Sequence, residues 1–158
     1  LRSALREDPD VILVGEMRDL ETISLALIAA ETGHLVLSTV HTSSAPKTVD
    51  RIIDVFPAEQ QNQVRTTFSE SILAIISQNL IKRANGKGMV PAVEIMIGIP
   101  AVRNLIREGK IVQIATVIQT GRQHGMQTMD HALNELFQQG IVEKEEIINL
   151  VSSPNILS

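Results

Sequence analysis

The chain has 158 residues, 44% hydrophobic and 20% charged, so it can bury an aliphatic core of ordinary size. Its net charge of -4 without a dense basic stripe argues against nucleic acid as the main partner, and only three aromatic residues argue against base stacking. The absence of cysteine excludes disulfides and thiolate metal sites, and without an apolar run of about 18 residues no transmembrane segment is predicted.

The opening stretch, LRSALRED, is typical of the end of a helix, here over residues 1–7. Pro9 would stop that helix, because proline disfavours the α conformation in the residue before it. A chain that opens with Leu1 inside a helix is expected to be a piece of a longer protein. Residues 11–14 then form a short, continuous apolar run, which predicts a strand covered on both faces in a parallel sheet.

A strand–helix–strand unit is predicted next. Asp19 is placed to cap a helix over residues 20–31, and Gly33 is placed to end it. The apolar run 35–40 predicts a second buried strand, followed by a loop over 41–46. This spacing is too long for a hairpin and favours a right-handed crossover between parallel strands.

The remaining chain is predicted to contain two helices, a strand pair and then only helices. The helices cover 46–54 and 58–78, the strands 79–83 and 89–97, and the later helices 100–108, 111–120, 127–139 and 143–152. We therefore expect an α/β part over 1–97 and a helical part over 98–158.

Polar residues that could take part in binding or catalysis follow both predicted parallel strands. Gly15, Glu16 and Arg18 follow the first strand, and His41 follows the second. Because parallel strands end at one edge, where open α/β sheets bind ligands, we expect Glu16 and His41 to lie close together. At the edge of a nucleotide pocket, Glu16 could hold Mg²⁺ through water or orient an attacking water.

Plainer interpretations stay open at this stage. Glu16 could be a solvated loop residue paired with Arg18, since charged residues at strand ends often have no further role. His41 lies in STVHTSS, which is also an ordinary Ser/Thr turn composition. No zinc-binding spacing and no G-x-S-x-G elbow is present in the sequence, so a structural zinc site or a serine hydrolase has little support.

The sequence contains no G-x-x-x-x-G-K-[ST] phosphate loop. A nucleotide-binding sheet edge without a phosphate loop is an incomplete site, so we expect the phosphate loop upstream of Leu1. Further on, AVRNLIREGK at 101–110 predicts an amphipathic helix. Such a helix is by default a surface helix, and its functional interpretation is a docking helix for a partner or a neighbouring subunit.

The chain resembles the secretion ATPase superfamily in five stretches that occur in order, from Leu1 to about Leu150: LREDPDVILVGEMRD, AAETGHLVLSTVHTSSA, RIIDVFP, AVRNLIRE and GMQTMDHAL. The first is similar to the family's Walker B box and the second to its His box. AVRNLIRE is similar to the C-terminal motif of the pilus-retraction branch, with Val102 where Ile is usual. The absence of cysteine also favours that branch, because the assembly and type II secretion relatives typically carry a four-cysteine insertion.

The resemblance implies a fold, an activity and a location. The fold would be the C-terminal part of a RecA-like P-loop ATPase core with a small helical C-terminal subdomain. The whole protein would be a homo-hexameric motor that uses ATP and Mg²⁺ to retract a type IV pilus. It would be cytoplasmic, peripheral at the inner-membrane pilus base and in contact with the platform protein there.

The resemblance also implies roles for individual residues. Glu16 matches the catalytic Walker B glutamate, with Mg²⁺ contact through water, and His41 matches the His-box residue on the γ-phosphate side. Gly15 and Arg18 would border the nucleotide, Arg18 with a more structural or interface role. The motif that would couple nucleotide state to retraction comprises Arg103, Asn104, Leu105, Ile106, Arg107 and Glu108.

The family's phosphate loop, Asp box and N-terminal domain would belong upstream, so residues 1–158 alone are expected to be inactive. The alternative is an ATPase-dead interaction module that docks motor or pilus-base subunits.

Overall fold

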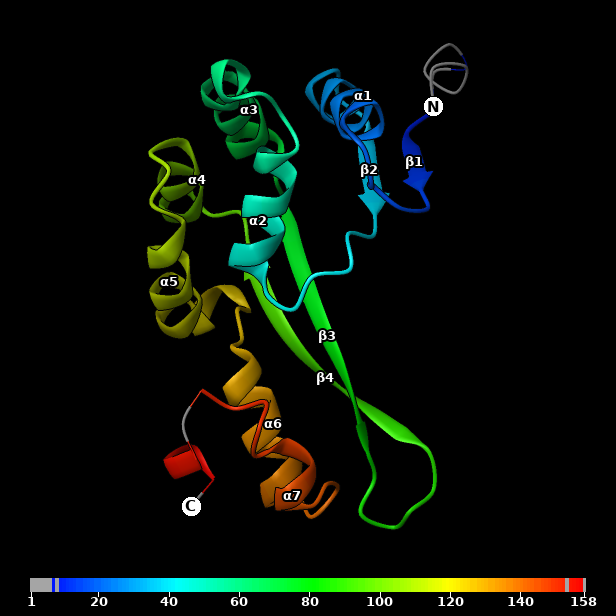
Figure 1. The fold of residues 1–158 in the computed structure, drawn as a ribbon, viewed down its shortest axis with the longest axis vertical. Coiled ribbons are helices and arrows are strands. Elements are labelled where there is room, and N and C mark those ends of the chain that lie inside the picture. The colour runs from blue at the N-terminus through cyan, green and yellow to red at the C-terminus, as the bar shows by residue number, and fades with distance from the viewer. Residues whose placement is uncertain (1–6, 8, 153, 158) are drawn as a thin grey trace. The chain divides into compact units, whose positions relative to one another are not determined.

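The structure is a computed structural model that describes residues 7, 9–152 and 154–157 (Figure 1). The predicted helix over 1–7 therefore lies outside the described residues, Glu7 apart. The helices and strands are β1 (Val11–Val14), α1 (Leu20–Glu31), β2 (Leu35–Ser38), α2 (Ala45–Asp54), α3 (Ala58–Ser71), β3 (Ala74–Lys82), β4 (Met89–Ile97), α4 (Pro100–Arg107), α5 (Ile114–Thr120), α6 (Met129–Gln138) and α7 (Lys144–Ile147).

The described chain forms two compact units. The first contains β1, α1, β2, α2 from Pro46 onward, α3 and α4, and the second contains β3, β4, α6, α7 and most of α5. The chain leaves the first unit after Leu73 and returns to it at Gly98. The division at residue 98 into an ATPase-core segment and a helical subdomain stays a prediction.

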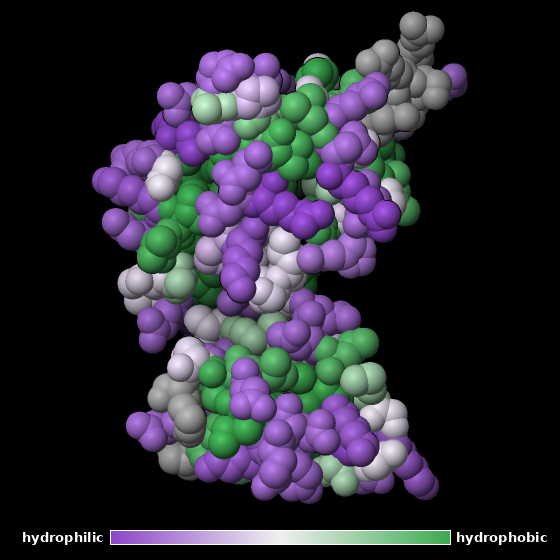
Figure 2. Space-filling view, viewed as in Figure 1, coloured by the Kyte–Doolittle hydropathy of each residue, from purple (hydrophilic) through white to green (hydrophobic). Residues whose placement is uncertain are grey.

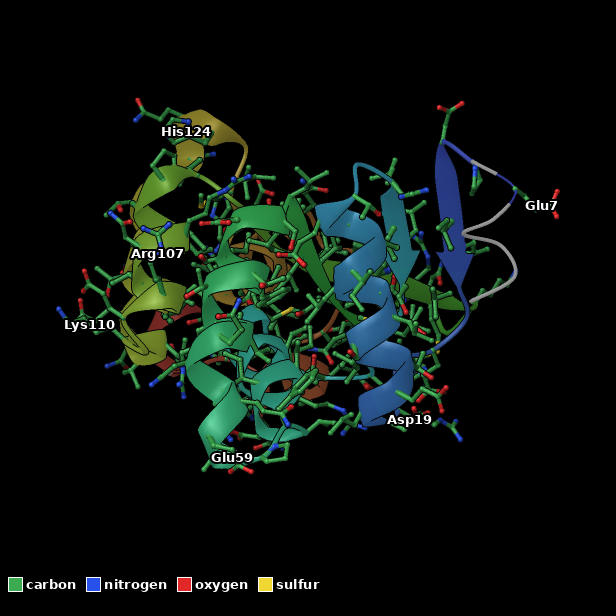
Figure 3. All side chains as sticks on the ribbon, turned by 90° about the horizontal axis from the view of Figure 1, so that it is seen from above. Glu7, Asp19, Glu59, Arg107, Lys110 and His124 are labelled. Carbon is green, nitrogen blue, oxygen red and sulfur yellow. The ribbon has the colours of Figure 1, made fainter. Side chains whose placement is uncertain are left out.

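The first unit is built on a parallel strand pair. β1 pairs with β2 in a register that runs from Val11 opposite Leu35 to Val14 opposite Ser38, so the predicted parallel crossover is confirmed. The Asp19 carboxylate accepts a hydrogen bond from the Thr22 amide at 2.8 Å and caps α1, at whose start it lies (Figure 3).

The prediction that β1 is covered on both faces is wrong for the described part of the chain. Ile12 is 5% exposed, but Leu13, which points to the opposite face, is 79% exposed. Since successive strand residues alternate between faces, only one face of this sheet is packed against helix α1 and its neighbours. Apolar groups therefore remain on the surface, as Figure 2 shows in green on the face in view.

The predicted long helix over 58–78 is wrong in its last turns. α3 ends at Ser71, and the chain continues as β3, which pairs antiparallel with all of β4. The apolar run that follows residue 71 suits a helix or a strand, and strand pairing decides between them because it satisfies the backbone of nine residues at once. Burial accordingly alternates with period two, with Ile75 buried and Ile76 67% exposed.

The second unit has its core between the hairpin and the later helices. Helix α6 lies along β4, and α7 contacts β3 (Figure 1). The core residues are Ile81, Val90, Ala92, Ala132, Leu133, Val142, Ile147 and Leu157. The predicted helix over 143–152 is shorter than expected, because α7 ends at Ile147. No helix in the described part of the chain combines the length and the apolar character needed to cross a bilayer.

Candidate functional site

The loops that follow β1 and β2 are bonded to each other. The Met17 amide donates to the Thr39 carbonyl at 3.0 Å, and the Thr39 hydroxyl donates to the Gly15 carbonyl at 2.6 Å. A Cβ placed on Gly15 would meet nothing within 4 Å, so open space borders the backbone at this position. The carboxyl edge of the sheet thus has a fixed backbone with room beside it.

The structure brings Glu16, Arg18 and His41 together at this edge. One oxygen of Glu16, Oε2, lies 2.7 Å from Nη2 of Arg18 and 3.8 Å from Nε2 of His41. The Glu16 side chain is 22% exposed, whereas those of Arg18 and His41 are 74% and 70% exposed. The expected proximity of Glu16 and His41 is therefore observed, while the roles of these residues stay predictions.

The charges around Glu16 keep it ionised. The hydrogen bond from Arg18 lowers the pKa of the Glu16 carboxyl most, against an opposing effect of desolvation, and the positive charges of Arg18, His41 and Arg51 lower it further. In turn, the hydrogen bond to Glu16 raises the pKa of Arg18. Arg51, in α2, was not identified as a site residue from the sequence, although it opens the stretch RIIDVFP, because only the placement of α2 brings its charge near Glu16.

His41 has an unusual backbone conformation. Its φ of 53° makes it the one non-glycine residue with positive φ in the described part of the chain. The left-handed region is uncommon for side-chain-bearing residues, although histidine is among those enriched in it. Such a conformation persists where the surrounding structure imposes it, and it is frequent at functional sites.

The predicted coupling motif divides into inward and outward residues. Val102 and Ile106 are fully buried, and Leu105 is half-buried. Asn104, Arg107 and Glu108 are exposed. Lys110, whose Nζ lies 2.8 Å from Oε2 of Glu108, points outward from the ribbon (Figure 3).

The charged side chain of Arg103 turns inward from this helix. It is half-buried, and its guanidinium donates to the carbonyls of Gly98 at 2.7 Å, Glu70 at 2.8 Å and Ile72 at 3.1 Å. It therefore bonds the start of α4 to the end of α3.

The described residues contain no group of three or more His, Cys, Asp or Glu side chains that could hold a metal ion. At the sheet edge, Glu16 contributes one ionised carboxylate. A single carboxylate fits an ion such as Mg²⁺, which usually keeps several waters and binds through one or two carboxylates and substrate phosphates.

These observations define an α/β protein with a charged site at the carboxyl edge of a parallel sheet, where proteins of this class bind ligands. The chain belongs to the type II/IV secretion system protein family, whose model matches residues 1–146.

The relatives of this chain include proteins named for twitching motility and for type IV pilus retraction. The chain is 64% identical over 145 residues to a twitching motility protein of Neisseria gonorrhoeae, covering 92% of this chain and 39% of that protein. It is 63% identical over 145 residues to the type IV pilus retraction ATPase PilT of Pseudomonas aeruginosa, covering 92% of this chain and 42% of that protein.

The fold is also that of a solved relative. A crystal structure of the pilus retraction motor PilT with bound ADP matches with a TM-score of 0.87 and 49% identity, over 98% of this chain and 43% of that chain. The predicted α/β fold class is thereby confirmed. This chain thus spans about two fifths of the length of these relatives.

Proposed function

We propose that the whole protein is an ATP-hydrolysing, homo-hexameric motor that powers type IV pilus retraction and hence twitching motility. It would act in the cytoplasm as a peripheral protein at the inner-membrane pilus base, beside the platform protein. The family and the described retraction motors among the relatives support this proposal. The observation that carries it is the meeting of Glu16 and His41 at the carboxyl edge of β1 and β2.

In this proposal Glu16 is the catalytic carboxylate. Its lowered pKa keeps it ionised at neutral pH, so it can accept a hydrogen bond from the attacking water and orient it toward the γ-phosphate. Mg²⁺, when bound, would neutralise charge on the phosphates, and Glu16 would contact it through water. Because Arg18 and His41 both lie against the same oxygen, Oε2, both residues also favour one direction for the carboxylate.

His41, Gly15 and Arg18 would line the nucleotide side of the edge. The exposed imidazole of His41, 3.8 Å from Glu16, can contact a phosphate oxygen and the carboxylate together. Gly15 would let a ligand approach the backbone, since the space beside it is open. The phosphate loop, absent from these 158 residues, would be supplied by the rest of the protein.

The retraction motif would act away from the chemical step. Its exposed members, Asn104, Arg107 and Glu108, would contact a neighbouring subunit or a pilus-base partner. Arg103, Leu105 and Ile106 would transmit nucleotide-dependent movement by holding helix α4 against its neighbours.

The test is ATP turnover by the full-length protein carrying Glu16→Gln. We expect turnover to fall by at least ~100-fold while ATP binding stays near wild type, because Gln preserves size and removes the charge. The matched control is Glu59→Gln, an exposed glutamate at the start of α3. Normal turnover in Glu16→Gln would refute the role of Glu16, and a wild-type protein without turnover would favour the ATPase-dead interaction module.

A further inference from the structure

The chain that leads into His41 is held at the sheet edge. Thr39 is bonded through both its carbonyl and its hydroxyl to the loop after β1, at Met17 and Gly15. Val40, the residue before His41, is buried, with 9% of its surface exposed. The backbone on the amino side of His41 therefore has little freedom to move.

The residue directly after His41 is held as well, by helix α2. The hydroxyl oxygens of Thr42 and Thr48 lie 2.5 Å apart and share a hydrogen bond in which either can be the donor. Thr48 is in the first turn of α2 and is 6% exposed, so little water can compete with Thr42 for its hydroxyl. Both threonines belong to the first compact unit, as do His41 and Glu16, so this bond lies within a single unit.

His41 adopts its left-handed φ of 53° between these two attachments. A residue with a side chain keeps such a conformation when its surroundings impose it, and here the residues on both sides of His41 are held. We propose that Thr48 is a positioning residue. Through its hydrogen bond to Thr42, it keeps the backbone of His41 in the conformation that places the imidazole beside Glu16.

The placement of α2 supports this role. Arg51 lies three residues after Thr48, on the same side of the helix, and its positive charge is among the causes that lower the pKa of the Glu16 carboxyl. The side of α2 that carries Thr48 is therefore the side turned toward the sheet edge. The catalytic consequence of the proposal rests on the proposed function, whereas its conformational consequence does not.

The first experiment is independent of catalysis. Hydrogen exchange of a peptide covering residues 40–45 is compared among full-length wild type, Thr48→Val, Thr48→Ser and Thr42→Val. Val keeps the shape of Thr without the hydroxyl, whereas Ser keeps the hydroxyl. Thr67→Val is the matched control, because Thr67 is also a buried helical threonine, in α3, and its hydroxyl donates to Glu31 of α1 at 3.2 Å. Unchanged exchange in peptides from β1 and β2 is the check that each variant is folded.

We expect exchange in this peptide to rise at least ~10-fold in Thr48→Val and Thr42→Val, and to stay within about 2-fold of wild type in Thr48→Ser and Thr67→Val. The double variant of Thr42→Val with Thr48→Val should match either single variant, because both substitutions remove the same hydrogen bond. Thr42 is half-buried, so Thr42→Val tests this bond even if Thr48→Val does not fold.

Exchange in Thr48→Val that matches wild type would overturn the proposal. An equal rise in Thr67→Val would also overturn it, since that result would assign the effect to the loss of any buried hydroxyl from the first unit.

The second experiment measures ATP turnover of the full-length protein in a double-mutant cycle of Thr48→Val with His41→Ala. If Thr48 acts through His41, Thr48→Val lowers kcat by ~10- to 100-fold with KM nearly unchanged, as misplacement of a site residue does, and Thr48→Ser keeps kcat near wild type. The double variant should then equal His41→Ala alone. Additive losses would overturn the proposal. Lack of turnover in wild type would refute the proposed function and leave the exchange experiment as the test of Thr48.

Discussion

Replacing Arg103 with Ala should weaken the packing of α4 on α3. The substitution removes hydrogen bonds to three carbonyls, those of Gly98, Glu70 and Ile72. Two of these carbonyls belong to the end of α3, where helix carbonyls lack partners within the helix and a positive charge is favourable. At about 1 kcal/mol of net stabilisation for each hydrogen bond, the expected loss is about 2–3 kcal/mol, since the side chain is only half-buried.

The measurement is urea unfolding of the full-length protein, with Arg107→Ala as the matched control. Arg107 is on the same helix but is exposed, and its hydrogen bond to the Asn104 side chain is long, at 3.5 Å. Its removal should change the free energy of unfolding by less than about 0.5 kcal/mol. If the two variants lose the same stability, the assignment of Arg103 as the residue that joins α3 to α4 is refuted.

The same pair of variants separates two roles that the proposed function gives to the predicted coupling motif. We expect Arg103→Ala to impair retraction together with stability, because the carbonyls of α3 lose their partner. Arg107→Ala should impair retraction with stability intact if the exposed face of α4 contacts a partner. Pilus retraction measured beside unfolding would distinguish these outcomes.

Gly98→Ala should lower the free energy of unfolding by more than about 2 kcal/mol, because the new Cβ would lie 2.2 Å from the Ile72 carbonyl oxygen. A urea midpoint equal to that of wild type would show that the backbone does not approach Gly98 this closely. The depressed pKa of Glu16 contributes stability above the unfolded-state pKa, and that contribution is lost as pH falls through the folded-state pKa. Arg18→Ala should therefore move the NMR-detected titration of Glu16 to higher pH, and an unmoved titration would remove Arg18 as the main cause. In urea unfolding, the free energy of unfolding of His41→Gly should stay within about 0.5 kcal/mol of wild type. His41→Val should lose about 1–2 kcal/mol, since a β-branched residue resists positive φ. Equal losses in the two variants would refute the view that the surrounding structure imposes the positive φ of His41.

Local patterns were sufficient to predict the first crossover and its charged edge. Asp19 caps α1 through its own near neighbour Thr22, and Val11–Val14 is apolar and β-branched, so short-range chemistry specifies both. Parallel strands must end at one edge, so the proximity of Glu16 and His41 follows from topology alone. The family resemblance added only the expected roles of these residues, which geometry does not supply.

Contacts between distant parts of the chain decided the rest. The run after Ser71 became a strand because β4 was available to pair with it over nine residues. Arg103 turned inward because α3 presents unpaired carbonyls to it, and Glu94 meets the Ala45 amide across 49 residues of sequence. Periodicity describes only which face of an element is apolar. Whether a polar group on that element finds a partner depends on the placement of other elements, and this placement exists only in the folded chain.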